Sequence, residues 1–200
     1  AFDWKTTLLA DKVGDEFGNQ YIIKGGGDEY KRLDLIKNTE ATMIVGVDFP
    51  KAQNVSDPLL TERISLAQLK HWELAPYNLG RLEQSEIPFV ITSAGSGDKF
   101  WQQLRLAVKN GLSEDAALAA LTIAPAKLMS LDSEIGSLAA NHLANFVVVD
   151  GPLFEKGSRI LSTWIRGEQH LVAKASALAL GNYDLTVSDA NGGHVYSIQI

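Results

Sequence analysis

Residues 104–150 read LRLAVKNGLSEDAALAALTIAPAKLMSLDSEIGSLAANHLANFVVVD, and the character of the chain changes within this stretch. Its first part predicts a helix that ends at Gly111, because glycine accepts the left-handed conformation that closes many helices. Ser113 is a suitable N-cap for the next helix, which the Ala-rich sequence extends to about Met129. Beyond Ser133 the pattern is of short β-type segments, so a domain of β/α units gives way to a separate β-module.

Upstream of this stretch, strand and helix patterns alternate. The strand segments are mainly apolar, as is typical of parallel strands that are covered on both faces. This alternation predicts a parallel sheet, but spacing alone leaves open whether the sheet is half of a doubly wound fold or an arc of an eightfold barrel. The pattern predicts strands at 20–24, 41–45 and 89–91, helices at 5–17, 28–38, 64–74, 76–84 and 96–110, and later β segments at 145–150, 160–166, 184–188 and 195–200.

Composition excludes several classes of function. The net charge is -6 and the 18 Lys and Arg residues are scattered, so the chain offers no surface for the phosphates of a nucleic acid. No apolar run approaches the roughly 20 residues that span a bilayer. The absence of cysteine removes thiolate chemistry and leaves both a cytoplasmic and an exported bacterial location open. The chain begins without Met and ends inside an apolar and polar alternation, so we expect it to be part of a longer protein.

Residues 104–150 resemble the closing segment of imidazolonepropionase-like amidohydrolases, through Asn-Gly-Leu-Ser, the Ala-rich helix with Ala-Pro-Ala, and the Ile-Gly-Ser-Leu phrase that leads to Phe-Val-Val-Val-Asp. Residues 72–93 are similar to the segment that leads to strand eight of that family, and residues 21–30 and 45–50 to strands six and seven. The resemblance implies the C-terminal part of a (β/α)8 TIM-type barrel, followed by a small β-sandwich-like module. It divides the chain into barrel units at 1–132, a returning β-module at 133–172 and the start of a further β segment at 173–200.

The resemblance also implies one or two divalent metal ions, zinc or another, that activate a water molecule to hydrolyse carbon-nitrogen bonds other than peptide bonds. The family takes its ligands from a His-x-His on strand one, a Lys or Glu on strand four, His on strands five and six, and Asp on strand eight. Only the last two positions fall within this chain. The motif Lys-Gly-Gly-Gly-Asp-Glu-Tyr places Gly25 at the histidine, and Thr-Ser-Ala-Gly places Ala94 at the aspartate. We therefore expect no metal ligand and no cofactor in this chain, and the motifs assign no catalytic residue to it.

The remaining polar candidates favour structural roles. Asp98 lies four residues beyond Ala94 and is the one weak catalytic candidate, although an N-cap ahead of Phe100 is the favoured interpretation. The glycine run at 25–27 favours a tight turn, capped by Asp28, over an anion-binding cradle. Four histidines are spread along the chain without metal-ligand spacing, and three tryptophans are expected in packing contacts: His71, His142, His170 and His194, with Trp72, Trp101 and Trp164.

Three functional hypotheses follow. The first is an amidohydrolase-family unit that is degenerate at its own metal site and belongs to a larger protein. Its partners would be the N-terminal remainder of the same barrel and a second amidohydrolase unit. The second is an active metal-dependent amidohydrolase whose ligands lie on the N-terminal half of the barrel. The third is a carbohydrate- or peptide-binding β-module.

Overall fold

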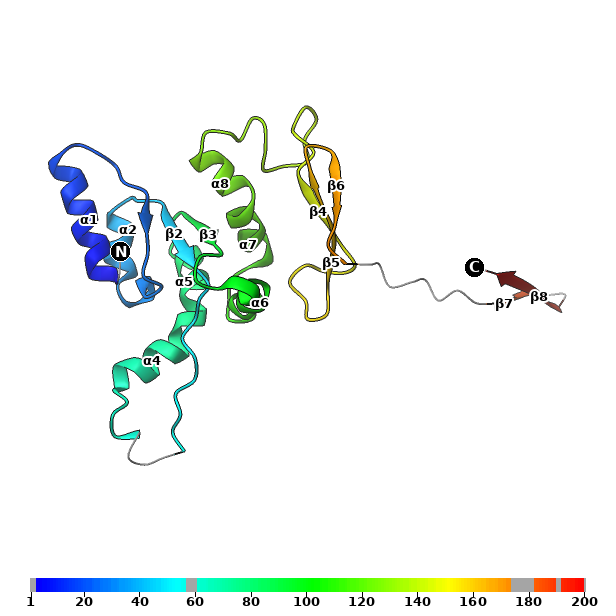
Figure 1. Cartoon of the computed structure of the whole chain (residues 1–200), viewed down its shortest axis with the longest axis horizontal. Helices are drawn as coiled ribbons and strands as arrows, with labels where there is room; N and C mark the ends of the chain where they lie inside the picture. Colours follow the sequence, from blue (N-terminus) through cyan, green and yellow to red (C-terminus); the bar gives the residue numbers. More distant parts are fainter. Residues whose placement is uncertain (1–2, 57–60, 174–181, 190–191, 200) are drawn as a thin grey trace. The chain divides into compact units, whose positions relative to one another are not determined.

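The protein forms two units, which are described separately. The computed structural model describes residues 3–56, 61–173, 182–189 and 192–199, the last two segments by their backbone alone. The first unit comprises Ala1–His142 and Phe154–Lys156, and the second comprises Leu143–Leu153 and Gly157–Ile200. Most of the helices and strands are labelled in Figure 1.

The first unit is built around a parallel sheet of three strands, β1 (Ile23–Lys24), β2 (Met43–Gly46) and β3 (Phe89–Thr92), in the order β1-β2-β3. Met43 of the central strand pairs with Ile23 on one side and with Phe89 on the other. Met43 and Val45 are buried. The sheet stays open at β1 and β3, so it is an arc of parallel strands and not a closed barrel. The predicted parallel β/α organisation is confirmed.

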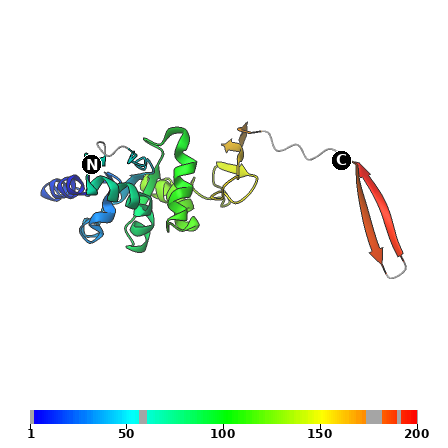
Figure 2. The same cartoon turned by 90° about the horizontal axis from the view of Figure 1, so that it is seen from below.

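Helices pack beside both outer strands of this sheet. Helix α1 contacts β1, whereas α7 and α8 contact β3, an arrangement that can be followed in Figures 1 and 2. No helix in the described part of the chain is both long and apolar enough to cross a bilayer. The helical elements are α1 (Trp4–Glu16), η1 (Glu29–Lys31), α2 (Leu33–Asn38), α4 (Leu66–Leu74), η2 (Ala75–Tyr77), α5 (Asn78–Gln84), η3 (Gly97–Lys99), α6 (Phe100–Lys109), α7 (Glu114–Leu121) and α8 (Ile123–Leu128).

Capping side chains set several helix starts. Ser113 caps α7 as predicted, because its hydroxyl oxygen accepts from the Ala116 amide at 3.1 Å. The long Ala-rich helix predicted to follow is instead divided at Thr122, where φ is -128° and ψ is -81°. Pro125 explains the division, since it has no amide hydrogen to continue the bonding pattern of α7 and is accommodated in the first turn of α8.

Two predicted caps are wrong. Asp28 makes no capping hydrogen bond to η1, and its Oδ1 instead accepts from the Trp4 amide at 2.8 Å. The predicted helix at 28–38 is therefore split into η1 and α2. Asp98 does not cap the helix ahead of Phe100, because it lies inside η3, which begins after Ser96.

The core of the first unit lies between the sheet and its helices. Gly80 of α5 packs so closely on the loop before α7 that a Cβ atom there would lie 2.6 Å from the carbonyl carbon of Gly111. The same loop is fixed by Glu83, whose Oε2 accepts from the Ser113 amide at 2.9 Å. The largest fully buried apolar side chains of the first unit are Ile36, Met43, Val45, Val47, Leu79, Leu82, Leu104 and Leu112.

The second unit contains an antiparallel sheet with the order β4-β5-β6, formed by β4 (Phe146–Val149), β5 (Ile160–Ile165) and β6 (Glu168–Leu171). Strand β6 was not predicted. It follows a two-residue turn at Arg166 and Gly167, both with positive φ, which matches the twist of a β-hairpin. Phe146 and Trp164 stack across the β4-β5 pair with their ring centroids 5.4 Å apart.

A further antiparallel pair joins β7 (Asn182–Asp189) to β8 (Gly192–Gln199). The β segments predicted at 184–188 and 195–200 fall on these strands, except that Ile200 lies outside the described residues. Pro58 of the predicted loop before α4 also lies outside them. The three-part division of the chain at residues 132 and 172 stays a prediction.

The tryptophans differ in their surroundings. Trp164 makes the predicted packing contact, and Trp101 meets Phe100 edge-on with their ring centroids 5.3 Å apart. Trp72 on α4 is 42% exposed, so the predicted packing role is not fulfilled by the described residues.

Candidate functional site

Enzymes built on parallel β/α barrels carry their sites at the carboxyl ends of the strands. The corresponding edge of this sheet is formed by the ends of β1, β2 and β3, at Lys24, Gly46 and Thr92. A Cβ atom at Gly46 would lie 3.4 Å from the carbonyl oxygen of Ala94, so the chain beyond β3 passes close to the end of β2. Gly25 directly follows β1. The structure thus places Gly25 and Ala94 along one edge of the sheet.

The segment that follows β1 contains a buried carboxylate. Glu29 is 0% exposed, and its Oε1 accepts from the Gly27 amide at 3.1 Å. Its Oε2 accepts from Nδ2 of Asn78 at 2.6 Å. Asn78, 1% exposed, is the first residue of α5, and its Oδ1 accepts from the Tyr30 amide at 2.8 Å. The side chain of Glu29 is therefore fixed inside the protein, under the end of β1.

Glu29 decides which side chain position 25 can carry. A Cβ atom at Gly25 would overlap Oε1 of Glu29, lie 2.9 Å from its carboxyl carbon and lie 3.2 Å from the terminal methyl of Met43. A histidine at this position would start inside the volume that the carboxylate occupies. Gly25 is consequently a steric requirement of the observed structure.

Tyr30 extends this polar cluster to helix α4. Its hydroxyl lies 3.0 Å from Nδ1 of His71, and the two rings stack with centroids 6.1 Å apart. Burial lowers the pKa of His71, and the nearby Lys31 lowers it further. The ring is therefore neutral at pH 7, and its Nδ1 accepts a hydrogen bond from the Tyr30 hydroxyl when Nε2 carries the ring hydrogen. Burial raises the pKa of Tyr30, which keeps the phenol protonated.

Asp28 ties the same segment to the N-terminal helix. Besides accepting from the Trp4 amide, it forms an ion pair with Lys31, whose Nζ lies 3.0 Å from Oδ2. We call residues 25–31 the β1 turn. Side chains of the β1 turn thus bond to α1 through Asp28, to α4 through Tyr30 and to α5 through Glu29. The turn is the polar centre of the first unit.

The end of β3 offers little chemistry by comparison. Ala94 is exposed, its amide donates to the Thr92 hydroxyl at 3.2 Å, and its methyl group can neither bind a metal nor transfer a proton. Gly95 has φ of 93°, and a Cβ atom there would lie 3.2 Å from Oδ2 of Asp48. Asp48 is exposed. Its position just beyond the predicted strand is the sequence signal that could have identified Asp48 as a carboxylate at this edge. Asp98, the weak catalytic candidate, is exposed in η3.

The four histidines lie on separate segments of the chain. His71 bonds to Tyr30, His142 has Nδ1 3.0 Å from the Ser137 hydroxyl, and His170 lies on β6. His194 lies on β8, where the backbone alone is described. Among the residues that the structure describes, no three His, Asp or Glu side chains come together in a way that could hold a metal ion.

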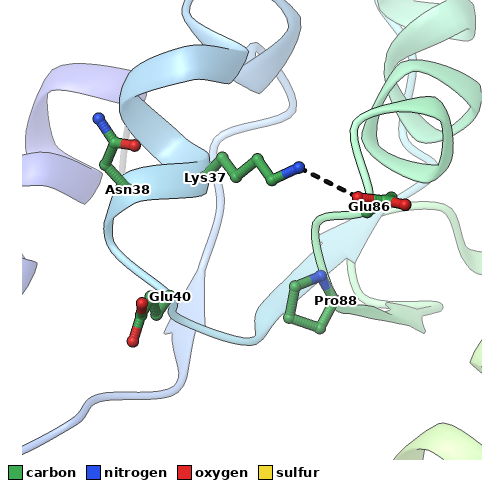
Figure 3. Close-up of a pocket in the computed structure, with 5 residues that line it drawn as sticks. All are labelled: Lys37, Asn38, Glu40, Glu86 and Pro88. Atoms are coloured by element: carbon green, nitrogen blue, oxygen red, sulfur yellow. Dashed lines mark hydrogen bonds and ion pairs between the residues drawn. The ribbon is translucent and has the colours of Figure 1, made fainter.

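A pocket of about 580 Å3 lies at the other end of the strands, opposite Gly25 and Ala94. Its lining residues come from the end of α2 and from the segments that precede β2 and β3, with Lys37 Nζ 3.2 Å from Glu86 Oε2 across it (Figure 3). The pocket is thus at the amino ends of the strands, away from the carboxyl ends where barrel enzymes carry their sites. It is lined by Lys37, Asn38, Glu40, Glu86 and Pro88.

The model of the amidohydrolase family matches residues 77–180, about half of the sequence. The chain belongs to the amidohydrolase family. This agrees with the open arc of parallel strands and with the imidazolonepropionase-like motifs. No curated protein matches the chain.

Solved structures of the family share the fold. An amidohydrolase from Thermotoga maritima MSB8 is 25% identical over 84% of this chain, with a TM-score of 0.64. A Xaa-Pro dipeptidase with bound methionine in its active site is 14% identical, with a TM-score of 0.55 over 82% of this chain. A prolidase complexed with N-methylphosphonate-L-proline is 16% identical, with a TM-score of 0.56 over 82% of this chain. The chain spans 41% of the first structure and 43% of the other two.

Amidohydrolases generally use divalent metal ions, so the residues at the two positions that the motifs predict for metal ligands can be tested for fit. They do not fit. Position 25 has no side chain and no room for one while Glu29 keeps its place, and position 94 carries a methyl group. Asp48 is a carboxylate near this edge, but a protein metal site needs several converging ligands.

Proposed function

We propose that this chain is an amidohydrolase-family unit that is degenerate at its own metal site and serves as a scaffold or partner surface within a larger protein. In this role it is a pseudoenzyme unit. Its partners are the N-terminal remainder of the same barrel, which pairs with the open edges at β1 and β3, and a second amidohydrolase unit that carries out the hydrolysis. The observation that carries the proposal is the buried Glu29 carboxylate in the space that a ligand side chain at position 25 would need.

An active enzyme is the competing proposal. In that case the metal ligands lie on the barrel strands outside this chain, and another group replaces the strand-eight acid. Asp48, beside Gly95, is the carboxylate at this edge that favours this alternative. The substrates would then be compounds with a hydrolysable carbon-nitrogen bond, and the names of the dipeptidase and prolidase add dipeptides to that class.

A binding function for the β-module has less support. A binding function would depend on the segment that contains the β7-β8 pair. The described backbone of this pair gives only the register of the two strands. A carbohydrate or peptide site would require a concave aromatic face in this region. Binding of a carbohydrate or peptide array to the isolated C-terminal segment would favour this function over the scaffold.

The decisive experiment restores one carboxylate in the full-length parent protein. Ala94→Asp places an acid at the family position, and Ala94→Asn is a matched control with the same shape and no charge. A degenerate unit gains no metal-dependent hydrolysis from either change, and because Ala94 is exposed, the added side chain should leave its stability almost unchanged. Metal content after dialysis and turnover of amide or lactam substrates are the measurements. A metal-dependent rise in turnover for Ala94→Asp alone would favour the active enzyme and exclude the degenerate unit.

A further inference from the structure

We propose that Gly25, Glu29 and Asn78 form an internal latch, in which the Glu29 carboxylate occupies the place of the lost ligand and holds the β1 turn on α5 without a metal. The latch deepens the proposed function, on which it rests only for the identity of the lost ligand. The three residues have a joint role: Gly25 leaves room for the Glu29 carboxylate, and Asn78 donates a hydrogen bond to it.

The first step in the argument is the hydrogen bonding of the carboxylate. Glu29 is fully buried, yet its two oxygens each have a donor, the Gly27 amide at 3.1 Å and Asn78 Nδ2 at 2.6 Å. Charge-assisted hydrogen bonds of this kind are stronger than neutral ones, and leaving a buried carboxylate unpaired is costly. Asn78 is 49 residues from Glu29, so the bond joins two successive β/α units of the sheet.

The amide of Asn78 completes the latch from its other side. Its Oδ1 accepts from the buried Tyr30 amide, while its Nδ2 donates to Glu29. A single side chain thereby satisfies a carboxylate and a backbone amide of the β1 turn. Because both partners are buried, their loss would leave donors or acceptors that water cannot easily reach.

The second step concerns space. Any Cβ atom at position 25 would overlap Glu29 Oε1, so the carboxylate and a side chain at 25 exclude each other. The glycine run was predicted to favour a tight turn over an anion cradle, and in the structure the Gly27 amide donates to the chain's own Glu29 carboxylate. A metal ligand at position 25 and the Glu29 latch are therefore alternatives at one place in the fold.

Two sets of variants of the full-length parent protein test this interdependence by urea unfolding. In the first, Gly25→Ala should lower the ratio of folded to unfolded protein by a factor of about 5 to 30. Gly46→Ala is the matched control, because a Cβ atom at the end of the neighbouring strand would meet its closest atom at 3.4 Å, an ordinary contact. In a Glu29→Ala background, Gly25→Ala should cause a much smaller further loss, since the overlapping carboxylate is gone and only the Met43 methyl, at 3.2 Å, remains close.

The second set exchanges the charge within the latch and does not depend on tolerance of a side chain at 25. Glu29→Gln alone removes one acceptor, so either Gly27 or Asn78 loses its partner. Adding Asn78→Asp allows the amide introduced by Glu29→Gln to donate to the new carboxylate, which can still accept from the Tyr30 amide. We expect the double variant to be more stable than Glu29→Gln alone.

The outcomes separate the latch from the proposed function. Equal unfolding midpoints for Gly25→Ala and Gly46→Ala, or equal losses from Gly25→Ala with and without Glu29, would overturn the latch. So would a double exchange that is no more stable than Glu29→Gln. Metal content and hydrolysis of the unmodified parent test only the degeneracy. A metal-loaded, active parent in which positions 25 and 29 are coupled would refute the degenerate unit and leave the latch in place.

Discussion

Replacing Gly80 by alanine sets helix propensity against packing. Gly80 is buried in α5, and alanine in a helix is more favourable than glycine by about 1 kcal/mol. A Cβ atom at this position would, however, lie 2.6 Å from the carbonyl carbon of Gly111, 2.7 Å from its oxygen and 2.8 Å from the Leu112 amide nitrogen. These are backbone atoms, so a simple change of rotamer cannot relieve the overlap.

The sizes of the opposing free-energy contributions decide whether Gly80→Ala stabilises or destabilises the protein. Overpacking of this kind costs about 1 to 3 kcal/mol. Moving the loop would also weaken the bonds between Glu83 and Ser113, which are worth about 1 kcal/mol in total at an exposed site. Subtracting the gain of about 1 kcal/mol in helix propensity leaves a net loss of about 1 to 3 kcal/mol in the free energy of unfolding.

Urea unfolding followed by tryptophan fluorescence measures this loss. Gln84→Ala, on the exposed side of the same helix, is the control and should change stability by less than about 0.5 kcal/mol. If the loop is displaced, Glu83→Ala will also cost less in the Gly80→Ala background than in the unmodified protein. A Gly80→Ala protein that is as stable as the parent, or more stable, would show that the close approach of α5 to the loop is not as described.

Three further predictions concern pH, capping and association. Burial lowers the pKa of folded His71 below the value of about 6.5 expected in the unfolded chain. The contribution of neutral His71 to the free energy of unfolding is therefore complete above about pH 6.5 and is lost as the pH falls through the folded pKa. His71→Gln should weaken this pH dependence, which can be measured as the urea midpoint between about pH 8 and pH 5. Ser113→Ala removes a cap and a bond to Glu83 and should cost about 1 to 2 kcal/mol, with Ser130→Ala as an exposed control in thermal unfolding. The isolated 200-residue chain should self-associate through its open sheet edges, and a compact monomer in light scattering would contradict this.

The sequence was sufficient to predict the three parallel strands, because their short apolar runs alternate with helical patterns. It was not sufficient where one residue interrupts a favourable pattern. The Ala-rich segment predicts a single helix, but the missing amide of Pro125 and the backbone of Thr122 divide it. The hairpin turn at Arg166 and Gly167 was overlooked because the first of them is not a typical turn residue.

The candidate site could also be predicted only in part from the sequence. Motifs placed Gly25 and Ala94 at the carboxyl edge of the sheet, where the structure has them. They did not indicate that Glu29 is buried, since its donor Asn78 is 49 residues away and reaches it only after α5 has packed. Local pattern likewise favoured Asp28 as a cap, whereas the folded chain offers it the amide of Trp4.

The central position of β2 has a consequence for local opening. Its residues Met43 and Ile44 pair with β1 on one side and β3 on the other, whereas β1 pairs through only Ile23 and Lys24. Opening of β1 would leave the β2-β3 pair intact, but opening of β2 would disconnect the whole sheet. Amide protons of β2 should therefore exchange with solvent deuterium only at the rate of global unfolding, and the amide of Ile23 should exchange through smaller fluctuations that leave the rest of the unit folded.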